Sequence, residues 1–174
     1  MKSLLPIILA IVIMIIPIAG CGGASPTACP KIGDKAPDIT FIGMDGKNVN
    51  LSDYAGKPVI LNTWNLSCIE CKREMPFFQE VYFQYKEKGL VLLSINTLDG
   101  IGNSTKDFLS KNNYTFTVLY DKNQDIYKKF CCPKNADPYT IFIGTDGIIK
   151  GFKIGGFIGT DDLITEVNKI LPAN

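Results

Sequence analysis

Runs of apolar residues alternate with turn-forming residues along the chain, and their period changes between that of strands and that of helices. Asp45-Gly46 lies between two short alternating stretches and predicts a β-hairpin turn. Further β-rich runs predict strands, and segments with apolar residues at helical spacing predict helices. The expected strands are 39–42, 48–51, 59–64, 90–95, 115–119, 139–143 and 148–153, and the expected helices are 69–88, 104–111, 123–130 and 161–171, the last with Thr160 as its N-cap.

The order of these elements predicts one α/β domain with a mixed sheet. Val59–Trp64 is short and mostly apolar, as is typical of a strand that is covered on both faces. Strands alternate with helices until a closing hairpin and a last helix, which favours a sheet with helices on its faces. We expect this domain to span residues 32–174.

The first twenty residues predict a targeting segment. Residues 1–3 carry one positive charge, and residues 4–19 are apolar and uncharged. The small residues before Cys21 resemble a bacterial lipoprotein box, in which Cys21 is lipidated and becomes the mature N-terminus. An uncleaved signal anchor and a plain secretory signal are the alternatives. We therefore expect a signal peptide at 1–20, a tether at 21–31, and an extracytoplasmic domain that is lipid-anchored to the bacterial membrane.

Composition excludes several classes of function. The chain has no His, so it contains neither a Ser-His-Asp nor a Cys-His catalytic pair, and no His-based metal site. Its 18 Lys and Arg residues nearly balance 17 Asp and Glu residues, which argues against a nucleic-acid partner. We expect no metal and no prosthetic cofactor, so the chemistry must use cysteine, carboxyl, lysine, arginine or tyrosine side chains or the backbone.

Cys68 and Cys71 are the candidate redox residues. Cys68 follows a predicted strand and opens the predicted helix 69–88. A cysteine at a helix N-terminus lies beside unpaired backbone N–H groups and the positive end of the helix dipole, which favour the reactive thiolate. Cys71 lies one turn later and can resolve a mixed disulfide on Cys68. The pattern predicts a dithiol couple, with a structural disulfide or half of a metal site as alternatives.

Short motifs accompany this pair along most of the chain. They are Ala36-Pro37-Asp38, Asp45-Gly46-Lys47, 51–57, 61–64, 68–71, 72–76, 137–143 and Asp146-Gly147. Through them the segment 35–171 resembles the TlpA/ResA-like thioredoxin-fold proteins, which are membrane-tethered thiol-disulfide oxidoreductases. The resemblance implies a thioredoxin-like α/β fold, in which helices flank a mixed central sheet with an added N-terminal β-hairpin. It also implies a cis peptide bond at Pro138, which would face the sulfur of Cys68.

The same resemblance suggests further site residues. Glu74 matches the family's acidic residue after the second cysteine, where a partly buried carboxyl with a raised pKa could relay the proton of Cys71. A solvated glutamate paired with a neighbouring cation is the alternative. Asn62 stands where thioredoxin itself carries its buried acid. Trp64 is expected either in the core or as an aromatic lining of the substrate groove.

The chain departs from the family's pattern around the predicted groove. Ser67 stands where thioredoxins usually have Trp, and Asp137 replaces the usual uncharged residue before the proline. The backbone of that residue normally pairs with bound substrate, so the charge of Asp137 would select a basic or polar partner. Trp64, Asp137 and Pro138 are thus the candidate substrate-binding residues.

Three further cysteines follow the candidate signal peptide and lipidation site. Cys131 and Cys132 are adjacent and precede the predicted cis-proline, and Cys29 lies in the predicted tether. Cys131 and Cys132 are expected to pack in the protein interior, or one of them to form a structural disulfide with Cys29. Cys131 and Cys132 could instead form a second redox pair near Cys68, a vicinal disulfide or a soft-metal site.

Charge and resemblance together suggest a function. Glu70 and Asp137 place negative charge near Cys68, which predicts a low reduction potential and a reductant of protein disulfides. The resemblance implies a role in cytochrome c maturation, with apocytochrome c as the substrate and a membrane thiol carrier as the electron donor.

Two other functions are weighed against this one. The first is a non-catalytic lipoprotein that binds a partner on the same scaffold. The second is a thiol peroxidase of the peroxiredoxin kind, which needs Thr or Ser three residues before its cysteine and Pro four residues before that. The chain has Asn65 and Leu61 at these positions.

Overall fold

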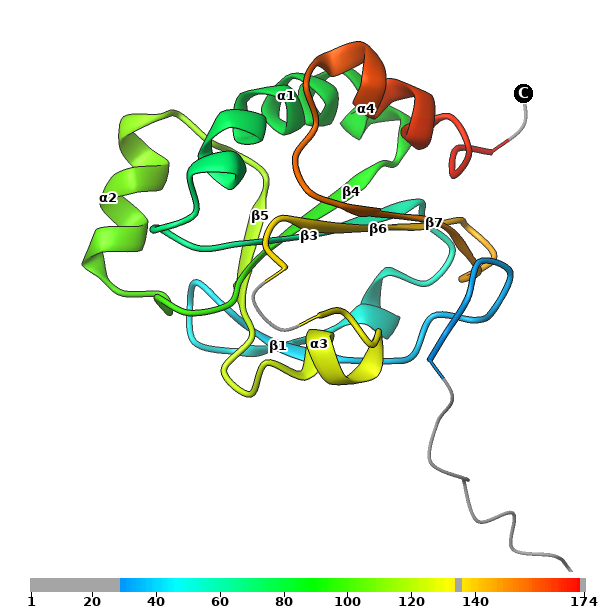
Figure 1. Cartoon of the computed structure of the whole chain (residues 1–174), viewed down its shortest axis with the longest axis horizontal. Coiled ribbons are helices and arrows are strands. Elements are labelled where there is room, and N and C mark those ends of the chain that lie inside the picture. The colour runs from blue at the N-terminus through cyan, green and yellow to red at the C-terminus, as the bar shows by residue number, and fades with distance from the viewer. Residues whose placement is uncertain (1–28, 134–135, 173–174) are drawn as a thin grey trace, which may run out of the picture.

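The central feature of the structure, a computed structural model that describes residues 29–133 and 136–172, is a seven-stranded mixed sheet. Its strand order is β2-β1-β5-β4-β3-β6-β7 (Figure 1). The strands are β1 (Thr40–Gly43), β2 (Asn48–Asn50), β3 (Val59–Trp64), β4 (Val91–Asn96), β5 (Thr117–Tyr120), β6 (Tyr139–Ile143) and β7 (Ile149–Ile154). β3 pairs in parallel with β4, and β4 with β5, whereas β6 runs antiparallel to β3.

Helices cover both faces of this sheet (Figure 1). They are α1 (Ile69–Tyr85), α2 (Asn103–Lys111), α3 (Asp125–Lys129) and α4 (Thr160–Val167), with 3₁₀ turns at Leu51–Tyr54 and Lys86–Lys88. Buried residues of α1, α2 and α4 share one core cluster, and those of α3 share a second cluster with Leu51. The predicted fold, a mixed sheet flanked by helices, is confirmed.

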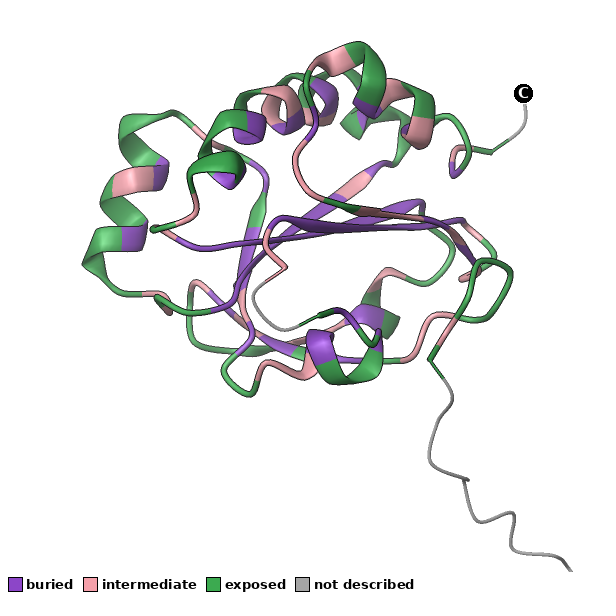
Figure 2. Cartoon of the chain, viewed as in Figure 1, coloured by how far each residue is buried: buried purple, intermediate pink, exposed green. Residues whose placement is uncertain are grey.

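Burial of β3 on both faces follows from its sequence. Ile60 packs in the cluster under α1, whereas Val59 and Leu61 pack in the cluster under α3. Successive side chains of a strand point to opposite faces, so an uninterrupted apolar run suits a strand that helices cover on both sides. Every residue of β3 is buried, as the purple strands in the middle of Figure 2 show.

The added N-terminal hairpin is also confirmed. β1 and β2 pair antiparallel with Phe41 opposite Val49, and Asp45-Gly46 forms the turn. Gly46 has φ of +82°, a left-handed conformation that glycine adopts without strain. β1 then joins β5 antiparallel with Ile42 opposite Tyr120, so the hairpin extends one edge of the sheet.

The ends of α1 and α4 differ most from the sequence prediction. α1 ends at Tyr85, and a 3₁₀ turn continues to Gly89, whose φ is +87°. α4 ends at Val167, earlier than expected, and its N-cap is Gly159 rather than Thr160. The hydroxyl of Thr160 donates instead to Glu80 Oε2 of α1 at 2.7 Å. A tertiary contact between helices thus takes the hydroxyl that a local cap would use.

The targeting segment lies outside the described residues, and with it the expected lipidation of Cys21. None of the helices within the described ranges combines the length and the apolar character that crossing a bilayer requires.

Candidate active site

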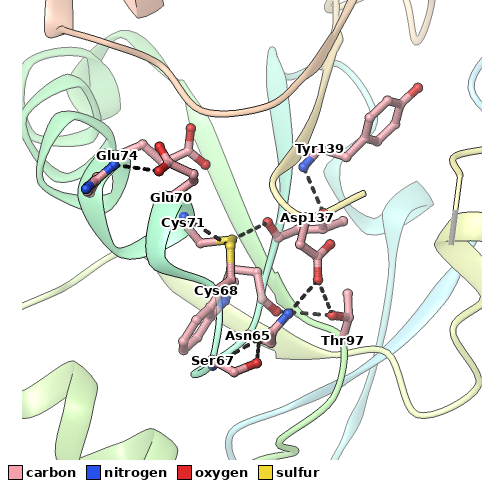
Figure 3. Close-up of a disulfide and its surroundings, with 12 residues drawn as sticks. Asn65, Ser67, Cys68, Glu70, Cys71, Glu74, Thr97, Asp137 and Tyr139 are labelled. Carbon is pink, nitrogen blue, oxygen red and sulfur yellow. Dashed lines mark hydrogen bonds and ion pairs between the residues drawn. A yellow bond between two sulfur atoms is a disulfide. The ribbon is translucent and has the colours of Figure 1, made fainter. Parts of the chain in front are cut away.

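Cys68 and Cys71 form a disulfide where β3 gives way to α1 (Figure 3). Their Cα atoms are 5.3 Å apart. Cys68 is the N-cap of α1, and the backbone N–H of Cys71 donates to Cys68 Sγ at 3.1 Å. The helix N-terminus therefore points an N–H donor at the sulfur of Cys68, and such a donor stabilises a thiolate once the disulfide is reduced.

Exposure separates the two sulfurs into an outer and an inner one. Cys68 is half-buried and lines an open groove of about 580 Å³. Cys71 is 0% exposed, and its Sγ lies 4.0 Å from the carbonyl oxygen of Thr63. A substrate disulfide can thus reach Cys68 but not Cys71. The groove is lined by Asn65, Ser67, Cys68, Ile69, Glu70, Leu98 and Asp137.

Glu74 is fully buried on the inner side of α1, three residues after Cys71. Its Oε1 accepts from Asn62 Nδ2 at 2.8 Å, and its Oε2 accepts from the backbone N–H of Phe157 at 2.9 Å. Burial raises the pKa of Glu74 from 4.5 to about 7, although both hydrogen bonds and the charge of Lys153 oppose the rise. The expectation of a buried carboxyl with a raised pKa agrees with this geometry, and its part in proton transfer stays a prediction.

We expect Glu74→Gln to slow thiol-disulfide exchange roughly 100-fold, the low end of what a positioned acid–base group contributes. The amide cannot exchange a proton with the Cys71 thiol. Rates measured between about pH 6 and pH 9 should lose an inflection near pH 7, where the wild-type Glu74 titrates. Rates and a pH profile equal to those of the wild type would remove Glu74 from the mechanism.

Stability gives a second readout of the same variant. The pKa of Glu74 is about 7 in the fold and about 4.5 when unfolded, so the folded chain holds an extra proton between these values. The free energy of unfolding should therefore fall by about 3 kcal/mol as the pH rises from about 4.5 to about 7, and then level off. Glu74→Gln should remove this contribution to the slope.

Asp137 lies at the groove with both carboxylate oxygens occupied. Its Oδ1 accepts from the hydroxyl of Tyr127 at 2.6 Å, and its Oδ2 accepts from Thr97 Oγ1 at 2.7 Å and Asn65 Nδ2 at 2.9 Å. All three donors are neutral side chains, and the selection of a basic or polar partner by Asp137 stays a prediction. The next peptide bond, to Pro138, is cis, as the resemblance implied.

Trp64 corrects one expectation about the groove. It is 0% exposed and packs in the core, where its ring lies 5.7 Å from that of Phe108. It does not line the groove, so it cannot contact a substrate there. Trp64 ends β3, and its side chain lies in the core cluster that α1, α2 and α4 cover, against which Cys68 also packs.

The candidate second redox pair, Cys131 and Cys132, is also corrected. Cys131 forms a disulfide with Cys29, and the two Cα atoms are 5.4 Å apart. Cys132 is the free cysteine among the described residues, and it is buried. Burial raises its pKa to about 12, so its thiol stays protonated and unreactive at neutral pH. The structural disulfide to Cys29 was one of the stated alternatives, and it is the one observed.

Sequence reasoning missed the residues that hold the acidic groups in place. Thr97, Tyr127 and the N–H of Phe157 come from distant segments, and nothing in their local pattern marks them. Asn62 was noted only as the counterpart of an acid in thioredoxin. The structure shows that Asn62 and Glu74 touch, so this chain places a carboxyl at the same spot from the helix side.

The site combines a CxxC disulfide at a helix N-cap with a groove that Asp137, the residue before a cis-proline, also lines, and this arrangement on a thioredoxin-like sheet defines a thiol-disulfide oxidoreductase. The profile of the AhpC/TSA family matches residues 32–152. Thiol-disulfide oxidoreductase ResA of Oceanobacillus iheyensis is 36% identical over 149 residues, which cover 82% of this chain and 74% of that protein. The chain therefore belongs to the AhpC/TSA family and is a thiol-disulfide oxidoreductase of the ResA type.

Solved structures agree with this assignment. The thioredoxin domain of a thiol-disulfide oxidoreductase from Bacteroides vulgatus superposes with a TM-score of 0.70 at 26% identity, over 82% of this chain and 99% of that one. A secreted disulfide oxidoreductase of Mycobacterium tuberculosis, described as homologous to DsbE of Escherichia coli, gives a TM-score of 0.65 at 25% identity, over 75% of this chain and 94% of that one.

Proposed function

We propose that this oxidoreductase works outside the cytoplasm as a reductant of protein disulfides. The thiolate of Cys68 attacks one sulfur of a substrate disulfide, and the other substrate sulfur leaves as a thiolate that takes up a proton. The thiolate of Cys71 then attacks Cys68 Sγ and releases the second substrate sulfur, so Cys68 and Cys71 end as a disulfide. Two electrons pass to the substrate, and a dithiol donor restores the reduced pair.

The direction of electron flow rests on the charge beside Cys68. Asp137 and Glu70 both line the groove that Cys68 opens into. Glu70 is paired with Arg73, which offsets its charge, whereas the donors to Asp137 are neutral side chains. A negative charge near Cys68 disfavours its thiolate, and a less stable thiolate form lowers the reduction potential of the couple. The carboxylate of Asp137 is the observation that carries this proposal.

Compartment and partners follow from other features. A second disulfide, between Cys29 and Cys131, is typical of proteins in oxidising compartments. One structural relative is a secreted protein, and the targeting segment with Cys21 supports a lipid anchor on the membrane. We propose apocytochrome c as the disulfide-containing substrate and a membrane thiol carrier as the donor, as the family resemblance implies.

The groove gives no support to the thiol-peroxidase alternative. Asn65 occupies the position that a peroxiredoxin fills with Thr or Ser, and it lacks their hydroxyl group. Its amide group donates to Asp137, and its oxygen accepts from the N–H of Ser67 at 3.0 Å.

The midpoint potential of the Cys68–Cys71 couple tests the proposed direction. The full chain in detergent is equilibrated with graded thiol buffers and alkylated, and peptide mapping then separates this pair from the Cys29–Cys131 pair. We expect a value at or below about −250 mV, close to that of thioredoxin. A value near about −120 mV would make the protein an oxidant, and a pair that does not cycle would overturn the proposal.

A further inference from the structure

Asp137 is the meeting point of three separate segments at the edge of the groove. Asn65 comes from the loop between β3 and α1, Thr97 directly follows β4, and Tyr127 belongs to α3. Each donates one hydrogen bond to the carboxylate, at 2.9, 2.7 and 2.6 Å respectively. We call these four residues the Asp137 clamp. An asparagine at position 137 could not accept all three hydrogen bonds in this way, because its side chain has an NH₂ donor in place of one of the two carboxylate oxygens.

The clamp reaches the reactive cysteine through Asn65. While its Nδ2 donates to Asp137, its Oδ1 accepts from both the N–H and the hydroxyl of Ser67, at 3.0 and 2.6 Å (Figure 3). Ser67 is the residue immediately before Cys68, and Asp137 is the residue immediately before Pro138. One amide side chain therefore connects the two chain segments that line the groove with Cys68.

The other two donors are buried and well suited to hold the carboxylate. Thr97 is 2% exposed, and its hydroxyl lies closer to Asp137, at 2.7 Å, than to the carbonyl of Trp64, at 3.3 Å. Tyr127 is 6% exposed, and burial together with its hydrogen bond to Asp137 raises its pKa. Its hydroxyl therefore keeps the proton that it donates. Hydrogen bonds to a charged group are among the stronger ones in proteins.

We propose that Thr97 and Tyr127 are positioning residues for the polypeptide part of the substrate. They hold Asp137 at a fixed place relative to Cys68, and so fix the groove across which a disulfide-containing chain must lie. A small disulfide needs only the sulfur of Cys68, whereas a polypeptide that brings a disulfide to Cys68 also lies against residue 137. The inference rests on the proposed exchange at Cys68 but not on the direction of electron flow.

Three variants of the full chain test this role. Thr97→Val and Tyr127→Phe each remove one donor and keep the shape of the side chain, whereas Thr97→Ser keeps the hydroxyl. The reduced enzymes react with insulin, whose disulfides lie in a polypeptide, and with 5,5′-dithiobis(2-nitrobenzoate), a small disulfide. We expect the first two variants to lose roughly tenfold in kcat/KM for insulin, mainly through KM, a loss equal to about 1.4 kcal/mol of binding. Thr97→Ser should behave as the wild type.

The rate with the small disulfide shows whether a variant has lost only the positioning of a polypeptide or has also damaged the reactive site. We expect both donor-deleting variants to react with it as fast as the wild type. Equal losses on both substrates would show a structural role alone and overturn the inference, as would unchanged kinetics on insulin or a loss in Thr97→Ser. Failure of the wild type to react with either disulfide would instead contradict the proposed function.

Discussion

Replacing Cys68 with serine is expected to abolish thiol-disulfide exchange, with a loss of at least roughly 1,000-fold in rate. Cys68 is the sulfur that opens into the groove, at the N-cap of α1, and Cys71 is fully buried behind it. A serine hydroxyl stays protonated at neutral pH and does not attack a disulfide. The measurement is the rate at which the pre-reduced variant reduces a protein disulfide.

Cys71→Ser should behave differently, and this difference tests the assigned order. Cys68 can still attack, but nothing resolves the mixed disulfide, so a covalent adduct with the substrate should accumulate and be visible by intact mass. Cys132→Ser is the matched control, because Cys132 is a buried thiol whose pKa is raised to about 12. It should exchange at the wild-type rate. An adduct on Cys71 in the Cys68→Ser variant would reverse the assigned roles.

Of the variants considered, the one that removes the disulfide between Cys29 and Cys131 is expected to lose the most stability. The two cysteines are 102 residues apart, and a cross-link over a loop of this length strongly restricts the unfolded chain. The chain-entropy argument gives about 4.7 kcal/mol for such a loop, and measured losses on removing a disulfide are typically about 2–4 kcal/mol. We expect Cys29→Ser to lower the free energy of unfolding by about 2–4 kcal/mol in a urea titration.

The double variant Cys29→Ser/Cys131→Ser controls for the free thiol that the single variant leaves. It should lose about as much stability as Cys29→Ser, because the bond rather than either side chain carries the effect. Cys132→Ser alone leaves the disulfide intact and serves as the second comparison. If Cys29→Ser unfolded with the same urea midpoint as the wild type, the disulfide would not restrain the unfolded chain in solution.

Local physics explains why part of the site could be predicted. Cys68 lies at the N-cap because a strand of apolar residues ends just before it and a helical pattern begins just after it. The spacing to Cys71 is about one helical turn, and Glu74 follows about one turn later, so each of the three residues lies close to the next one along the helix. These relations involve residues that are close in sequence, and the period of a helix determines them.

Contacts between distant residues could not be predicted in this way. The hydroxyl of Thr160, a good local cap, bonds to Glu80 on another helix. Trp64 packs inside rather than lining the groove, because β3 is covered on both faces. The strand pattern predicted that covering but did not say on which side of the sheet the groove would open.

The amino-acid sequence alone indicated the class of fold and the redox pair, because both depend on patterns within a few helical turns or strand periods, whereas the resemblance to a known family pointed to Glu74. Only the tertiary structure decided that Cys131 pairs with Cys29, that Cys132 is left free and buried, and that Asp137 is held by donors from three segments. Pairing and hydrogen bonding require atoms to meet in space. The packing of the whole sheet, rather than any local pattern, brings these residues together.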